Sequence, residues 1–335
     1  MRIGLAGVGR IGAFHAQTLS ALDAVDEVVV TDANTEAAKA VAAEQGLGVA
    51  PDADSLLGQV DAFVIATATP GHAPLLRRAL AAGVPTFCEK PVAASIEETI
   101  DLARLAASTD VPVHVGFQRR FDVGYQRARK SVQSGELGFV HTIRANTHDQ
   151  SPPHAAYIPT SGGLFRDCSV HDFDIIRFVS GREVVSVYAT GANKGADFFR
   201  EAGDVDTAAA VLTLDDETLV VVSATRYNGA GHDVRMEVMG EKGSIGVGLD
   251  DSLALVSAEE GVDWPRGPQK WSFMERFLPA YRSELTAFTA VAAGREPSPC
   301  TVRDALQASR TAEACELSRA ENRPVLLSEI AGADL

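Results

Sequence analysis

The stretch Ile3-Gly4-Leu5-Ala6-Gly7-Val8-Gly9-Arg10-Ile11-Gly12 decides the fold of the first part of the chain. A short apolar run leads into a Gly-x-Gly-x-x-Gly turn, and apolar residues then recur at helical spacing. In a strand–turn–helix unit, Gly7 permits the tight turn, Gly9 lets the backbone approach a pyrophosphate, and Gly12 lets the helix pack on the strand. The helix N-terminus then faces the phosphates. The pattern predicts a dinucleotide site that includes Gly7, Gly9, Arg10, Ile11 and Gly12.

An acidic residue, Asp32, ends the second apolar run, Val28-Val29-Val30-Thr31. It lies about 20 residues past the glycines, where a carboxylate hydrogen-bonds the ribose hydroxyls of adenosine. A carboxylate there would repel a 2′-phosphate, so the sequence favours NAD over NADP as the cofactor. The alternative is that Asp32 only caps the helix that starts near Thr35, since Asp is common at that position. The glycine turn upstream makes ribose binding the better interpretation.

Strand and helix patterns alternate through residues 1–118, and the apolar runs are continuous, as in parallel strands. This alternation predicts a doubly wound parallel sheet whose strand ends line one edge, where ligands bind. Lys90 comes directly after one of these strands, near the expected position of a nicotinamide. A lysine there can bind a substrate hydroxyl and stabilise a developing alkoxide. The simpler alternative is a surface lysine that pairs with Glu89.

The pattern changes after residue 118, because consecutive strands follow one another without crossover helices. Such strands predict a second domain, residues 119–335, with a large open, mainly antiparallel sheet flanked by helices. The strands are expected near residues 140–148, 184–192, 205–214, 218–227, 234–239, 244–247 and 253–257. Residues 215–217 read as a hairpin turn. The apolar run 219–222 suggests a strand covered on both faces, on one by helices and on the other by a second copy of the chain.

A second dense stretch is Gly162-Gly163-Leu164-Phe165-Arg166-Asp167-Cys168-Ser169-Val170-His171. Asp167 and His171 are four apart, so on a helix they share one face, with Cβ atoms about 5–6 Å apart. A carboxylate beside an imidazole orients the ring and favours its protonated form, which suits a proton acceptor near neutral pH. The plain alternative is an exposed helix start. Cys168 would point off this face and reads as a small buried side chain rather than a nucleophile.

The composition narrows the partners. The 335 residues carry a net charge of −15, which argues against a nucleic acid or an anionic membrane as partner. No apolar run is long enough to span a bilayer, and the N-terminus lacks the shape of a signal peptide. The four cysteines are scattered, without a disulfide framework or metal-ligand spacing. We therefore expect a cytoplasmic protein with no metal site.

Taken together, these features resemble the glucose–fructose oxidoreductase/inositol dehydrogenase (Gfo/Idh/MocA) family over essentially the whole chain. The resemblance rests on the glycine turn, Asp32, Glu89-Lys90-Pro91 and Asp167-x-x-x-His171. Two stretches are similar to the inositol 2-dehydrogenase branch: Gly116-Phe117-Gln118-Arg119-Arg120-Phe121-Asp122, and residues 163–174. The resemblance implies that the chain oxidises an inositol or a similar cyclic polyol to a ketone with NAD. It also implies an assembly, often a tetramer, joined through the open sheet.

The resemblance implies roles for individual residues. Lys90 would bind substrate and support proton transfer, His171 would take the hydroxyl proton, and Asp167 would bind substrate and orient His171. Further cofactor contacts are implied at Thr67, His72, Glu89 and Lys90. Further substrate contacts are implied at Gln118, Asp149, His232 and Tyr281.

The chain departs from the family pattern where it is expected to meet the substrate. Thr147-His148-Asp149-Gln150 stands where an Arg-Asp-Pro element is usual, and His232 stands where a tyrosine is frequent. An alternative function is therefore a dehydrogenase or reductase of another sugar or cyclic polyol. A third is a non-catalytic NAD(H)-binding regulator. The presence of Lys90, Asp167 and His171 together argues against that reading.

Overall fold

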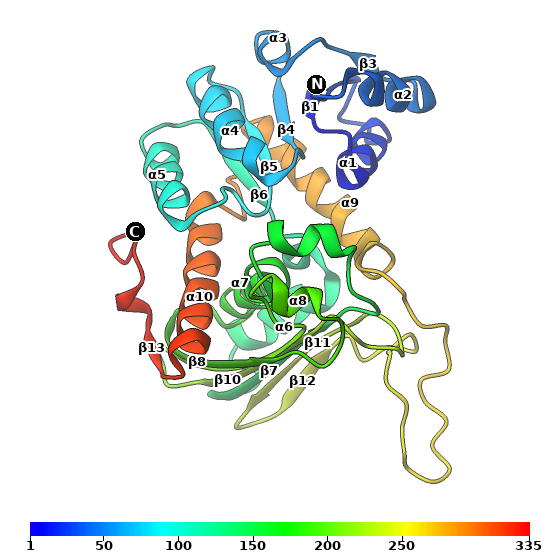
Figure 1. Ribbon diagram of the computed structural model, residues 1–335. Coiled ribbons are helices and arrows are strands. Elements are labelled where there is room, and N and C mark those ends of the chain that lie inside the picture. Colours follow the sequence, from blue (N-terminus) through cyan, green and yellow to red (C-terminus); the bar gives the residue numbers. More distant parts are fainter. The chain divides into compact units, whose positions relative to one another are not determined.

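The computed structural model describes all 335 residues, which form two compact units (Figure 1). The first contains residues 1–118, 281–307 and 334–335, and the second contains residues 119–280 and 308–333. The expected boundary after Gln118 falls where the first unit ends, but residues 281–307 group with the first unit rather than the second. The reason is that Leu285 and Phe288, in the second half of helix α9 (Phe273–Ala292), belong to the first unit's apolar core. The functions expected of each domain stay predictions.

The first unit is built around a six-stranded parallel sheet in the order β3-β2-β1-β4-β5-β6, which confirms the predicted doubly wound sheet. The strands are β1 (Arg2–Ala6), β2 (Glu27–Thr31), β3 (Gly48–Val49), β4 (Ala62–Ile65), β5 (Thr86–Glu89) and β6 (Val113–Gly116). The helices between them are α1 (Arg10–Ser20), α2 (Thr35–Gln45), α3 (Ala53–Leu57), η1 (Thr69–Gly71), α4 (His72–Ala81) and α5 (Ile96–Ala107). Because all strands run the same way, their carboxyl ends lie at one edge of the sheet.

The second unit contains a seven-stranded sheet in the order β12-β11-β7-β10-β9-β8-β13. Its strands are β7 (Val140–His148), β8 (Val184–Ala192), β9 (Thr207–Leu214), β10 (Leu219–Thr225), β11 (Asp233–Gly240), β12 (Ser244–Val247) and β13 (Val325–Leu326). The predicted mainly antiparallel sheet is confirmed, as is the hairpin at residues 215–217. The exception is the pair β7 and β10, which run parallel.

The strand expected at residues 253–257 is wrong. Leu253 and Ala254 are buried, which gave the segment its strand-like pattern. Its backbone instead forms local turn and loop contacts: Leu253 N donates to Asp250 O at 3.1 Å, and Ser257 N donates to Trp264 O at 3.1 Å. Burial beneath a loop produces the same apolar signal as burial in a sheet.

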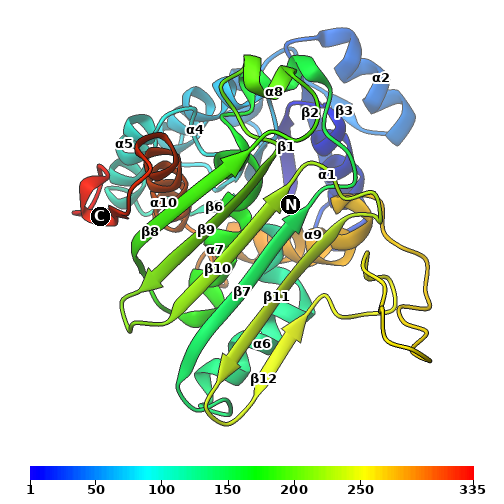
Figure 2. The ribbon, with the colours of Figure 1, turned by 60° about the horizontal axis from the view of Figure 1, so that its bottom comes forward.

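Helices cover one face of this sheet and leave the other bare (Figure 2). The unit's helices are η2 (Gln118–Phe121), α6 (Val123–Gln133), η3 (Ala155–Thr160), α7 (Val170–Ser180), α8 (Phe198–Glu201), η5 (Leu327–Glu329) and most of α10 (Val302–Glu321). Helix α7 packs on β7, and α6 packs on β12. Along β10, Val220 and Val222 are buried while Leu219 is 51% exposed and Val221 is 42% exposed. In the single chain the expected double cover is therefore present on one face.

The helix expected to carry Asp167 and His171 begins with a π-helical turn, η4 (Phe165–Ser169), before α7. Gly181 caps α7 in the left-handed conformation with φ +68°, as expected for a helix C-terminus. A π turn widens the helix, so Asp167 and His171 do not follow the spacing of a regular α-helix. Single π turns of this kind recur at functional sites.

No helix of the structure is long and apolar enough to cross a membrane.

Candidate active site

The glycine turn of the first unit has the geometry that its sequence predicts. Gly7 has φ +95°, and a Cβ there would lie 2.5 Å from Thr67 N. A Cβ at Gly12 would lie 1.8 Å from Gly7 O. At Gly9 a Cβ would meet no atom within 4 Å, so this backbone borders open space. The turn thus combines close internal packing with an exposed backbone edge at the start of α1, as a pyrophosphate-binding turn requires.

Asp32 lies beside this turn at the carboxyl end of β2. Its Oδ2 accepts a hydrogen bond from Val8 N at 2.8 Å, and its Oδ1 accepts one from Asn34 N at 2.8 Å. The alternative that Asp32 caps the next helix is wrong, because Asn34 is the N-cap and accepts from Ala37 N at 3.2 Å. A carboxylate fixed next to the glycine turn is the hydrogen-bond acceptor that the ribose hydroxyls of adenosine need. Together the glycines and Asp32 fit NAD.

His72 and Thr67 meet at the next strand ends. His72 is 2% exposed, and its Nε2 lies 2.9 Å from Thr67 O while its Nδ1 lies 2.6 Å from Pro91 O. The imidazole therefore connects the segment after β4 to the segment after β5. This arrangement fixes the backbone on which Lys90 stands.

Glu89 is the last residue of β5 and Lys90 follows it directly, and both side chains are half-buried. Glu89 Oε1 lies 2.7 Å from His15 Nε2, on helix α1, and Glu89 Oε2 accepts from Lys90 N at 3.2 Å. Glu89 uses its carboxylate on the buried His15 and on the backbone of Lys90.

Two further expected substrate contacts are buried. Gln118, at the end of the first unit, is 3% exposed, and Tyr281 is 6% exposed. The Tyr281 ring packs against the rings of Phe14 and His15, with centroids 5.5 Å and 5.9 Å apart. Their contact with substrate stays a prediction.

In the second unit, the Asp167 carboxylate has a donor on each oxygen. Arg226 Nη2 donates to Oδ2 at 2.6 Å, and the Tyr157 hydroxyl donates to Oδ1 at 3.0 Å. Burial raises the pKa of Tyr157, and the Asp167 charge raises it further, so the phenol keeps its proton and remains a donor. His171 follows four residues later, half-buried in the first turn of α7.

Arg226 also binds Asp149, so the structure brings together two of the predicted substrate residues. Its Nη1 donates to Asp149 Oδ2 at 3.0 Å and to Cys168 Sγ at 2.8 Å. His232 Nδ1 lies 3.3 Å from Asp149 Oδ1. Burial works against the charge of Asp149, but the hydrogen bond from His232 and the Arg226 charge outweigh it and lower the pKa of that carboxyl. Cys168 is buried, as expected, although its sulfur lies among polar groups.

Two buried ion pairs anchor helix α7 below this cluster. Arg119 Nη1 donates to Asp172 Oδ1 at 2.6 Å, and Arg120 Nη2 donates to Asp174 Oδ1 at 2.6 Å. Thr147 Oγ1 donates to Asp172 Oδ2 at 2.7 Å, which ties the helix to β7. These pairs join the two stretches that resemble the inositol 2-dehydrogenase branch, and they explain structurally why both are charged.

The sequence analysis missed Arg226 and Tyr157. Arg226 directly follows β10, and a charged residue at the end of a buried strand was the available signal. Tyr157 lies in η3, in the segment after β7, and it precedes Asp167 by 10 residues in the sequence. Neither residue has a spacing relation to Asp167 that a periodic pattern could reveal.

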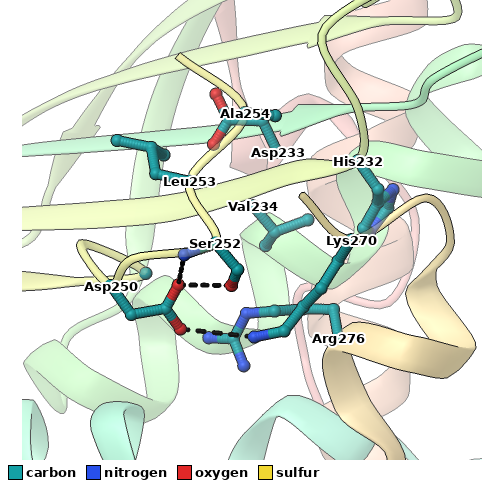
Figure 3. Close-up of a pocket in the computed structure, with 10 residues that line it drawn as sticks. His232, Asp233, Val234, Asp250, Ser252, Leu253, Ala254, Lys270 and Arg276 are labelled. Carbon is teal, nitrogen blue, oxygen red and sulfur yellow. Dashed lines mark hydrogen bonds and ion pairs between the residues drawn. The ribbon is translucent and has the colours of Figure 1, made fainter. Parts of the chain in front are cut away.

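A small, open concavity lies next to His232 (Figure 3). It is lined by residues from β11, the loop after β12 and the start of α9, among them His232, Val234, Asp250, Lys270 and Arg276. Its charged groups are paired with one another or with nearby residues: Lys270 Nζ lies 3.3 Å from Asp250 Oδ2, and Arg276 Nη1 donates to Asp122 Oδ2 at 2.8 Å. His232 thus faces Asp149 through Nδ1 and also borders this concavity, which has room for about one water molecule.

Comparisons with known proteins agree with this fold. The family model described as oxidoreductase family, NAD-binding Rossmann fold, matches residues 1–117, and the GFO/IDH/MocA C-terminal domain model matches residues 125–246. The chain is 38% identical to the myo-inositol dehydrogenase Hyg17 of Streptomyces leeuwenhoekii, covering 95% of this chain and 97% of that protein. It is 36% identical to the inositol 2-dehydrogenase of Rhizobium meliloti, covering 98% and 99%.

Solved structures show the same similarity. A probable dehydrogenase from Thermotoga maritima superposes with a TM-score of 0.92 at 32% identity, covering 98% of this chain and all of that one. The scyllo-inositol dehydrogenase of Lactobacillus casei with bound NAD(H) and scyllo-inositol gives a TM-score of 0.88 at 30% identity, covering 98% and 99%. The chain belongs to the Gfo/Idh/MocA family of oxidoreductases, and NAD is its cofactor.

Proposed function

We propose that this enzyme oxidises one ring hydroxyl of an inositol, myo-inositol or an isomer, to the ketone. The observation that carries the proposal is the Asp167 carboxylate, held by Arg226 and Tyr157 four residues before His171 in the widened first turns of a helix. The similarity to dehydrogenases that are named for inositols supports this substrate class.

His171 serves as the general base that takes the proton of the reacting hydroxyl. Lys90 binds that hydroxyl and stabilises the negative charge that develops on its oxygen. Asp167 accepts hydrogen bonds from substrate and orients His171. When bound, NAD would supply the hydride acceptor. The residues that would hold it are Gly7, Gly9, Arg10, Ile11, Gly12, Asp32, Thr67, His72, Glu89 and Lys90. Gln118, Asp149, His232 and Tyr281 are the proposed further contacts to substrate.

A second candidate is a dehydrogenase or reductase of another sugar or cyclic polyol, with the same three residues at work. The specific observation is the close approach of His232 to Asp149, which places an imidazole where the family resemblance leads us to expect a phenol. An imidazole presents a ring nitrogen in place of a hydroxyl, so a different pattern of substrate hydroxyls would be recognised.

NADH formation tests the function directly. Purified protein is given NAD with myo-inositol, scyllo-inositol, chiro-inositol, glucose and xylose in parallel, and absorbance is followed. We expect one inositol isomer to have the highest kcat/KM of the five substrates. A pyranose whose kcat/KM is higher by orders of magnitude supports the second candidate. Silence with every substrate, while NADH still binds, supports the non-catalytic regulator.

The bare face of the second unit's sheet supports the proposal of a homo-oligomer, a tetramer joined through this face. Tyr188, Val211 and Val221 lie side by side across β8, β9 and β10 by register, and they are 40%, 47% and 42% exposed. Apolar surface in such a row favours burial against a second copy.

All four cysteines are free and buried, which supports a reducing setting such as the cytoplasm.

A further inference from the structure

The parallel pairing of β7 and β10 brings the carboxyl ends of these two strands together in the second unit. His148, the last residue of β7, is paired with Thr225, the last residue of β10. The residues that follow, Asp149 and Arg226, therefore lie next to each other at one edge of the sheet. Backbone bonds fix both positions: Asp149 N donates to Thr225 O at 2.9 Å, and Arg226 N donates to Asp206 O at 2.8 Å.

The Arg226 side chain is 4% exposed, and its two terminal nitrogens divide between two acids. Nη1 reaches Asp149 at 3.0 Å, and Nη2 reaches Asp167 at 2.6 Å. A buried guanidinium needs compensating charge, and these two carboxylates supply it. The planar fork fixes their relative position, because both contacts come from one rigid group.

Resting on the proposed function, we propose that Arg226 is a positioning residue for the reaction: it holds the Asp167 carboxylate in the orientation and charge state that substrate and His171 require. Tyr157 completes the arrangement on the other oxygen. A carboxylate oxygen can accept more than one hydrogen bond, so Asp167 can also accept from a substrate hydroxyl or an imidazole N–H.

The charge state of Asp167 depends on the titratable and charged groups next to it in this unit. Arg226 is the cation. Tyr157 is a neutral donor, Asp149 is a second carboxylate on the same guanidinium, and the Cys168 thiol and the His171 imidazole follow Asp167 along the helix. Without the guanidinium, two carboxylates would share one partly buried site, and such a pair retains a proton to higher pH. The enzyme would then lose its ionised Asp167 at the acid end of its working range.

The test compares wild type with Arg226→Met, Arg226→Lys and, as a matched control, Arg182→Met. Arg182 is a half-exposed arginine of the same unit whose Nε lies 3.1 Å from Asp216 Oδ2. The kcat and kcat/KM for the inositol isomer that wild type uses are measured between about pH 5 and pH 9. In parallel, the side-chain carboxyl of Asp167 is titrated by NMR in ¹³C-labelled protein, with Asp167→Asn assigning the signal. NADH binding reports folding of the dinucleotide unit.

We expect Arg226→Met to lower kcat/KM by about 10²–10³-fold and to move its acid limb to higher pH, because the carboxylates then hold a proton more strongly. Arg226→Lys keeps the charge but not the fork, so its acid limb should match wild type while kcat falls about tenfold or more. In Arg182→Met both kcat/KM and the position of its acid limb should match wild type. The Asp167 carboxyl should titrate at higher pH in Arg226→Met than in wild type.

An Arg226→Met enzyme with the wild-type acid limb and the wild-type Asp167 titration would overturn the positioning role. If that variant does not fold, wild-type kcat in Arg226→Lys would do so. The outcomes separate this inference from the function it rests on. A wild-type enzyme that oxidises no inositol removes the substrate assignment, while the Asp167 titration still decides whether Arg226 controls that carboxylate.

Discussion

His15 on helix α1 and Glu89 at the end of β5 lie 2.7 Å apart, from Nε2 to Oε1, inside the first unit. His15 is fully buried, and the other Glu89 oxygen accepts from Lys90 N. The helix that begins at the glycine turn is therefore connected through one carboxylate to the lysine proposed to bind substrate.

We expect His15→Leu to lower kcat by about 10²-fold, because a displaced Glu89 no longer fixes the backbone of Lys90. Steady-state rates with NAD and the preferred inositol measure the effect, and far-UV circular dichroism checks the fold. His15→Gln, which keeps a donor at this position, should recover part of the rate. Equal rates in His15→Leu and wild type would show that the contact has no role in turnover.

Lys90→Ala and His171→Ala should each lower kcat by about 10²–10⁴-fold while NADH binding stays nearly unchanged. The reason is that the proposed base and the group that stabilises the alkoxide act on substrate, whereas the glycine turn and Asp32 hold the dinucleotide. Fluorescence titration with NADH and turnover assays separate the two properties. Near wild-type turnover in either variant would remove that residue from the mechanism.

The dinucleotide unit could be predicted because its determinants are local. Each strand, its following turn and its helix are adjacent in sequence, so Gly7, Gly12 and Asp32 could be assigned from spacing alone. The sequence left one point undecided, namely whether Asp32 or a neighbouring residue is the N-cap of α2. In the structure the N-cap is Asn34. Because all these strands run parallel, their carboxyl ends lie at one edge of the sheet.

The site in the second unit could be predicted only in part, because its contacts join distant segments. Asp167 and His171 were found from their spacing in one helix. Arg226 lies beside Asp149, 77 residues earlier in the chain, because β7 pairs in parallel with β10. It meets Asp167 because η4 packs against β10. No local pattern encodes that pairing, and antiparallel neighbours were the general expectation for consecutive strands.

Asp32→Asn should weaken the preference for NAD over NADP by about tenfold or more in kcat/KM. The amide keeps an acceptor for Val8 N but removes the charge that would repel a 2′-phosphate. Kinetics with both cofactors at fixed inositol measure the ratio. Asp54→Asn, an exposed acid on α3, is the control and should leave the ratio unchanged. A wild-type enzyme that already prefers NADP would contradict the role given to Asp32.

Val211→Asp should break the proposed assembly. Val211 lies at the centre of the row Tyr188–Val211–Val221 on the bare sheet face, and burying a new carboxylate there costs several kcal/mol. Light scattering after size-exclusion chromatography should show a tetramer for wild type and a smaller particle for the variant. Val256→Asp, a 74% exposed position in the loop after β12, is the control. The proposed interface fails if the Val211 variant keeps the wild-type mass.

The Asp149–Arg226 pair should make stability depend on pH in a defined direction. The pKa of Asp149 is lowered in the folded protein by His232 and Arg226 despite burial, so its contribution is fully present above its unfolded pKa of about 3.9. Below that pH the contribution is lost as the folded carboxyl takes up its proton. Asp149→Asn should therefore reduce the free energy of unfolding by about 3 kcal/mol at neutral pH, and by progressively less below about pH 4.

Urea unfolding at several pH values measures this, with Asp215→Asn as a more exposed control that should change little at any pH. A gap between wild type and Asp149→Asn that is constant from neutral pH to about pH 3 would mean that Asp149 acts through packing and not through its charge.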